Sequence, residues 1–72
     1  MGARVFKEHD VFVLSKSLHD DSVPLGSTGV VLMVFPAESP AYEVEFPDDK
    51  GGNLGKSPTY TITGEYMTVT SD

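Results

Sequence analysis

The stretch GSTGVVLMVF, residues 26–35, followed by YEVEF, residues 42–46, decides the fold class. Two glycines among its first four residues are typical of a turn, and the six apolar residues after them are typical of a strand. The second stretch alternates apolar residues with two glutamates, which predicts one buried and one solvent-facing side. A tight connection at 36–40 joins them, so we expect an antiparallel pair.

Both faces of the first strand are apolar. Val30, Leu32 and Val34 alternate with Val31, Met33 and Phe35. One interpretation is a long, bent strand that serves the core with different faces at its two ends. The other is that one face is an interface, and the sequence leaves both open. Gly29 predicts a close approach or a bulge near the start of the strand.

Working outward, β-branched and aromatic residues cluster in three more short runs between turn residues. They predict strands at 10–15, 58–63 and 66–70. A polar loop fills 16–27, in which we expect Gly26 to take a positive φ and Val23 and Leu25 to point inward. A break at Gly64–Glu65 suits one 3-10 turn. No window has helical periodicity.

We therefore expect an all-β fold: a small five-stranded SH3-like barrel with one long loop after the first strand, forming a single domain over residues 1–72. An OB-fold is the nearest alternative, but it normally needs a helix that no window supplies. With 72 residues and no cysteine, the core has no disulfide or thiolate–metal support.

The charge balance favours a basic protein partner. Eleven acidic residues against five basic ones give a formal net charge of −6, which repels nucleic-acid backbones and anionic membranes. The longest apolar run, 30–35, is too short to span a bilayer, and the first residues lack the apolar core of a signal peptide. We expect a cytoplasmic protein without membrane contact.

A family resemblance rests on three motifs: EHDVFVL at 8–14, LGSTGVV at 25–31 and AYEVEF at 41–46. They resemble a family of small bacterial proteins catalogued as domain-of-unknown-function family 4926, over about positions 6–46. The resemblance implies an SH3-like barrel and, for some members, a neighbouring gene for another small protein, in the manner of antitoxins and immunity proteins. The glycine step also resembles KOW-type barrels, which implies contacts with RNA or protein.

Candidate chemical sites have simpler structural explanations. His9-Asp10 and His19-Asp20-Asp21 are better explained as an entry turn, with Asp10 accepting backbone amides, and a solvated loop than as metal ligands. The 26–29 turn lacks the lysine and following helix of a phosphate site. No nucleophile is paired with a base. We therefore expect no enzyme activity, metal or cofactor.

These observations predict a non-catalytic protein-interaction module, in its sharpest form an antitoxin-like or immunity-like partner of a basic protein encoded nearby. Acidic side chains would steer the partner, with apolar anchors at the centre. The residues expected to bind are Asp20, Asp21, Phe35, Glu43, Glu45, Asp48, Asp49 and Tyr66. The alternatives are an RNA- or DNA-binding barrel and a homo-oligomeric structural protein that uses the second apolar face.

Overall fold

The computed structural model describes residues 5–70, which form one antiparallel sheet of five strands. The strands are β1 (Val11–Leu14), β2 (Thr28–Phe35), β3 (Ala41–Glu45), β4 (Tyr60–Thr63) and β5 (Met67–Val69). A single 3-10 turn, η1 (Gly64–Tyr66), joins β4 to β5. All five predicted strands and the 3-10 turn are confirmed. The expectation about a signal peptide concerns the first residues of the chain, and residues 1–4 lie outside the described part.

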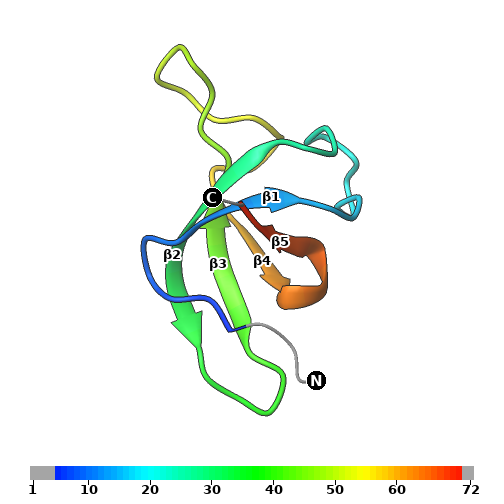
Figure 1. Ribbon diagram of the computed structural model, residues 1–72. Helices are drawn as coiled ribbons and strands as arrows, with labels where there is room; N and C mark the ends of the chain where they lie inside the picture. Colours follow the sequence, from blue (N-terminus) through cyan, green and yellow to red (C-terminus); the bar gives the residue numbers. More distant parts are fainter. Residues whose placement is uncertain (1–4, 71–72) are drawn as a thin grey trace.

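The sheet has the order β4-β3-β2-β1-β5 and curls around its core (Figure 1). Chain neighbours pair from β1 to β4, and β5 returns to pair with β1. The all-β class is therefore confirmed, but within residues 5–70 the two outer strands do not pair with each other, so the ring of a closed barrel is not seen. No helix in this part of the chain is long and apolar enough to cross a membrane.

Aromatic rings form the centre of the core. Phe12 contacts Phe6 and Phe46 edge to face, with ring centroids 6.3 and 5.6 Å apart. Tyr42 packs against Phe6 at 5.6 Å, and its hydroxyl accepts a hydrogen bond from the Phe6 amide. Edge-to-face geometry places the positive rim of one ring against the negative face of another, which adds to the gain from burial. The segment before β1 is thereby fixed to the core.

A β-bulge at Leu32 explains the two apolar faces of β2. Val31 pairs with Val44 and Met33 with Glu43, so β2 has one more residue than β3 between these pairs. The extra residue reverses the alternation, because successive side chains of a strand point to opposite faces. Val31 is fully buried and Val34 packs against the core, whereas Met33 and Phe35 are exposed. The bent strand is confirmed, and Val31 is separated from the two residues expected to share its face.

Gly29 and Gly26 have the roles that their positions predict, whereas Leu25 does not. A Cβ on Gly29 would lie 2.9 Å from the Phe46 ring and closer still to Phe12, so the predicted close approach is confirmed. Gly26 has φ 88° in a turn closed by a bond from the Ser27 amide to the Pro24 carbonyl. The inward placement of Leu25 is wrong, since it is 60% exposed. The turn directs it outward, and Val23 and Leu18 anchor the loop in the core.

Candidate protein-binding surface

The sheet has an outer face, on the side away from the aromatic core, that combines apolar and acidic side chains. Register places its residues in three cross-strand rows, since paired residues point to the same side. The rows are Val11–Val30–Glu45, Met33–Glu43–Thr61 and Phe35–Ala41–Thr63. Val11, Met33 and Phe35 are 44%, 46% and 41% exposed, so three apolar side chains on this side of the sheet reach solvent. We call these nine residues the outer face.

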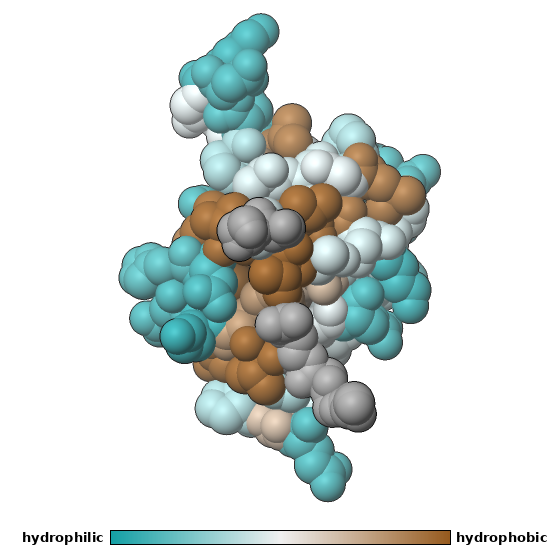
Figure 2. Space-filling model, viewed as in Figure 1, coloured by the Kyte–Doolittle hydropathy of each residue, from teal (hydrophilic) through white to brown (hydrophobic). Residues whose placement is uncertain are grey.

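The charge of the outer face is entirely negative. Glu43 lies beside Met33 and Glu45 beside Val30, and no lysine or arginine belongs to the three rows. Among the described residues the one ion pair is Lys16–Glu65, elsewhere in the fold, with 3.4 Å between Nζ and Oε2. The outer face therefore presents exposed apolar side chains beside two carboxylates that form no ion pair with any residue from 5 to 70. Figure 2 shows apolar side chains exposed over β1 and β2, whereas the projecting loops are hydrophilic.

The eight residues predicted to bind a partner do not form one patch. Phe35, Glu43 and Glu45 share the outer face. Asp48 and Asp49 lie in the hairpin extension between β3 and β4 that projects from the sheet in Figure 1. There the Asp48 carboxylate accepts hydrogen bonds from the amides of Lys50 and Gly52, at 2.9 and 2.8 Å, and so shapes the turn. The remaining three belong to the loop after β1 and to η1.

Asp20 is part of a hydrogen-bonded group that we call the Tyr60 network. The Tyr60 hydroxyl donates to Asp20 Oδ2 at 2.9 Å and accepts from the backbone amides of Lys56 and Ser57. Ser22 Oγ lies 2.9 Å from that hydroxyl and donates to Asp20 Oδ1 at 2.7 Å. The network joins the loop after β1 to the loop before β4. The adjacent Asp21 is exposed, with φ 56°.

These contacts hold the pKa of Asp20 below its ordinary value. The main cause is the hydrogen bond from the Ser22 side chain, and the Ser22 amide, the Tyr60 hydroxyl and the charge of Lys56 act in the same direction. Each stabilises the ionised carboxylate, whereas burial acts against it. Asp20 therefore has a structural role in fixing the loop after β1, in addition to the binding role predicted for it.

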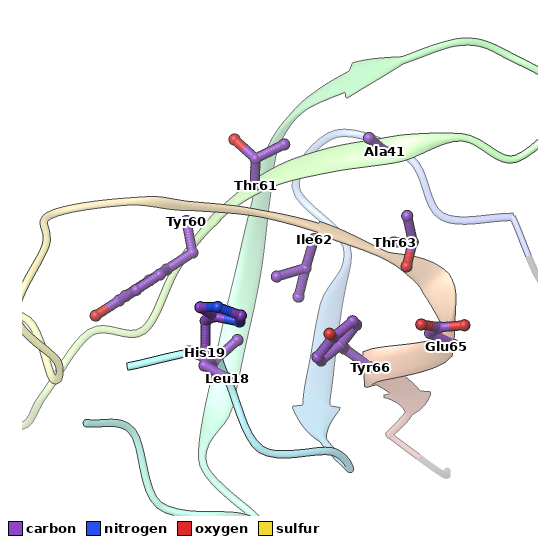
Figure 3. A pocket seen from close by; sticks show the side chains of 9 residues that line it. All are labelled: Leu18, His19, Ala41, Tyr60, Thr61, Ile62, Thr63, Glu65 and Tyr66. Atoms are coloured by element: carbon purple, nitrogen blue, oxygen red, sulfur yellow. The ribbon is translucent and has the colours of Figure 1, made fainter. Parts of the chain in front are cut away.

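A groove of about 440 Å³ follows the unpaired edge of β4, and we call it the edge groove. All four residues of β4 line it, facing Leu18 and His19 across the hollow, with Glu65 and Tyr66 at its end. In Figure 3, Tyr60 and Ile62 point from β4 toward Leu18 and His19, and Thr61 points the opposite way. Tyr66 thus lines this groove, separate from Phe35 on the outer face, with the Lys16 ammonium 5.1 Å from its ring centre.

The histidine–aspartate pairs have local structural roles. Asp10 Oδ2 accepts a hydrogen bond from the Lys7 amide at 2.8 Å, so the entry turn predicted before β1 is confirmed. His9 has φ 72° in this turn, and its amide donates to the Val31 carbonyl. His19 lines the edge groove. Within residues 5–70, no three histidine, aspartate or glutamate side chains are grouped as a metal site requires.

Sequence reasoning missed Met33 as an exposed neighbour of Glu43, because the bulge that exposes it leaves no mark in a uniformly apolar run. It also missed the edge groove, whose walls come from segments about forty residues apart. The alternation in residues 42–46 did contain a usable signal. Any apolar residue paired with one of its glutamates must lie on the solvent side of the sheet.

Comparison with known proteins identifies the family of the chain. No curated protein and no solved structure matches the chain. The family model described as Domain of unknown function (DUF4926) matches residues 8–55, which include the first three strands, the loop after β1 and most of the extension that follows β3. Because this match spans well over half of the 72 residues, the chain belongs to that family.

Proposed function

We propose that this protein is a non-catalytic interaction module that binds a basic protein surface through its outer face. The observation that carries the proposal is the pairing of exposed Met33 with Glu43 on an outer face without a basic residue. Apolar anchors supply binding energy where water is excluded, and rim charges raise the association rate and select the partner. The sharpest form of the proposal is an antitoxin-like or immunity-like role toward a protein encoded nearby, in a bacterial cytoplasm.

The charges of the outer face favour a basic partner over a second copy of this chain. A two-fold interface would bring the same patch of two molecules together, including both copies of Glu43 and Glu45. Four carboxylates would then meet without a compensating base, and the repulsion would cost affinity. The same carboxylates oppose the phosphates of a nucleic acid. Lysine or arginine side chains on a protein partner would form ion pairs with the carboxylates of Glu43 and Glu45.

The experiment is co-purification of the chain with the product of its neighbouring gene, followed by a titration of the complex. Replacing both Glu43 and Glu45 with lysine should weaken binding at least about tenfold and remove much of its salt dependence. The matched control replaces Glu8 and Glu38, both exposed and off the outer face, with lysine, which changes the net charge by the same amount. We expect the control to bind almost as tightly as the native chain.

Phe35→Ser tests the apolar component separately. The side chain is exposed, so the fold should keep its stability while affinity falls by about tenfold. The proposal fails if no complex forms at micromolar concentration, or if both charge variants lose the same affinity. Retention of the native chain on a nucleic-acid resin at low salt, with loss at high salt, would favour the nucleic-acid alternative instead.

A further inference from the structure

We propose that the partner inserts an extended segment along the unpaired edge of β4, so that it joins the sheet as an additional strand beside the outer face. This inference rests on the proposed function, because it names the part of the basic partner that the chain recognises. The segment would alternate apolar residues, which enter the edge groove, with basic residues, which reach the carboxylates of the outer face. It would use backbone hydrogen bonds for affinity and side chains for selection.

The edge of β4 is available for pairing. Among residues 5–70, β4 pairs with β3 on one side and with no strand on the other. Beyond that ladder and η1, no backbone hydrogen bond between described residues involves Tyr60–Thr63. In a strand, alternate residues direct their N–H and C=O groups to opposite sides, so the outer side of β4 presents unpaired donors and acceptors. A neighbouring strand is the structure that satisfies such a row completely.

The edge groove supplies space for the inward side chains of that strand. All four β4 residues line it, so the hollow borders the edge of the strand and not just one of its faces. Ile62 from β4, Leu18 from the loop after β1 and Tyr66 from η1 give it apolar walls. Its volume, about 440 Å³, lies within the range of ligand pockets, so apolar side chains fit there.

Charge complementarity identifies the outward residues of the segment. A strand beside β4 extends the row Met33–Glu43–Thr61 by one position. Strands are about 4.8 Å apart, so a side chain next to Thr61 starts about 10 Å from Glu43 along that row. A lysine or arginine spans most of this gap across the short Thr61 side chain and meets the glutamate. The edge groove and the outer face are in this way parts of one continuous surface.

The other free edge is less suited to this role. β5 has only three residues, Met67–Val69, and the hollow near its end is bordered by Val5 and Asp10 from the segment before β1. Its outward residue Thr68 is paired with Val13, so that row contains no carboxylate. A second hollow of about 440 Å³ borders Met67 and Thr68 and has Glu38 and Glu65 in its lining. The three residues of β5 nevertheless offer an added strand fewer backbone groups than the four residues of β4 do.

The probe is a short synthetic peptide that alternates valine with lysine, titrated into the ¹⁵N-labelled chain at low and moderate salt. We expect shifts of the β4 amides and of Leu18, His19 and Tyr66, and hydrogen exchange of β4 amides slowed at least about tenfold by the peptide. A peptide that alternates valine with glutamate should not bind. Shifts confined to Met33, Phe35 and Glu43, without protection of β4, would overturn strand addition, as would binding of both peptides alike.

Variants of Thr61 separate this inference from the proposed function. Thr61 is exposed, so Thr61→Lys should leave the fold intact. Repulsion should weaken the binding of the lysine peptide and of the partner at least about fivefold. Thr61→Val keeps the β-branched shape, Thr68→Lys adds the same charge at the β5 edge, and both should bind as the native chain does. If only the Glu43 and Glu45 variants weaken the partner, strand addition fails and the proposed function stands. If no partner binds, the proposed function fails, and the peptide shifts still decide strand addition.

Discussion

Different interactions hold the chain together at the start of β2 and at the start of β4. We call the ring packing at β2 the apolar closure and the hydrogen bonds at β4 the polar closure. At the first, the Phe12 and Phe46 rings pack directly on Gly29. At the second, the Tyr60 hydroxyl joins two loops through hydrogen bonds, and a Cβ on Gly55 would lie 2.5 Å from its oxygen. Both sites exclude a side chain at the glycine, but one depends on volume and the other on polar partners. We therefore expect an added methyl group to destabilise the first site and protonation of its carboxylate to destabilise the second.

The largest effect is expected for Gly29→Ala, which tests the apolar closure. The new methyl group would overlap the Phe12 ring, so a buried aromatic side chain must move, at a cost of about 3 kcal/mol. A small domain without disulfides has about 3–5 kcal/mol of stability, so most of it would be lost. Urea denaturation followed by circular dichroism measures the change.

Gly26→Ala is the matched control for that variant. Its Cβ would meet no atom within 4 Å, and only the φ of 88° opposes it, at a cost of about 1 kcal/mol. Gly29 does not have the positive φ of Gly26, so equal losses in the two variants would mean that the rings move aside at little cost and do not determine the requirement for glycine at position 29.

Variants of Val31 and Met33 test where along β2 the buried core ends. Val31→Ala removes two fully buried methyl groups and should lower the free energy of unfolding by about 2 kcal/mol. Met33→Ala, beyond the bulge, should change it by less than about 0.5 kcal/mol, because that side chain is 46% exposed. Thermal unfolding of both variants provides the measurement. A large loss for Met33→Ala would place this residue in the core and remove it from the proposed binding surface.

The sequence predicts the elements of this fold better than their contacts. Strand positions follow from local alternation, and the close approach at Gly29 follows from a glycine in an apolar run. The bulge at Leu32 does not, because neighbouring side chains of one kind leave the register undefined until β3 pairs. The Tyr60 network cannot be predicted from the sequence for another reason. Its partners lie 38 and 40 residues from Tyr60 and meet only when the sheet has formed.

The same limit explains why the predicted binding residues are divided among several places. Glu43 and Glu45 are adjacent in an alternating strand, so their common face is predictable. The aspartates lie in loops, and two of them, Asp20 and Asp48, accept hydrogen bonds from backbone amides of their own turns. Short acidic side chains next to turns readily accept local amide hydrogen bonds. The proposed binding surface therefore depends on the two strand glutamates and not on the loop aspartates.

Tyr60→Phe tests the polar closure and should have a smaller effect than either core variant. Loss of the hydroxyl removes one donor and one acceptor from a half-exposed network, whose amides regain contact with water. We expect a cost of about 1 kcal/mol, with faster hydrogen exchange at Lys56 and Ser57. Unchanged exchange there would mean that the packing of Leu18 and Val23 holds the loop after β1 without the hydroxyl. In Gly29→Ala, hydrogen exchange at Lys56 and Ser57 should become faster only as much as the lower global stability requires.

The smallest effect is the pH dependence that Asp20 gives to the polar closure. Because its pKa is lowered in the folded state, the unfolded chain binds the proton more readily. Its contribution to stability is therefore complete above the ordinary value of 3.8 and is lost as the pH falls through the lower, folded pKa. The other carboxylates titrate in the same range, so the informative quantity is the difference in unfolding free energy between the native chain and Asp20→Asn. We expect this difference to shrink on acidification, whereas the difference between the native chain and Val31→Ala stays constant. A constant difference for both variants would mean that the Asp20 charge does not contribute to holding the two loops together.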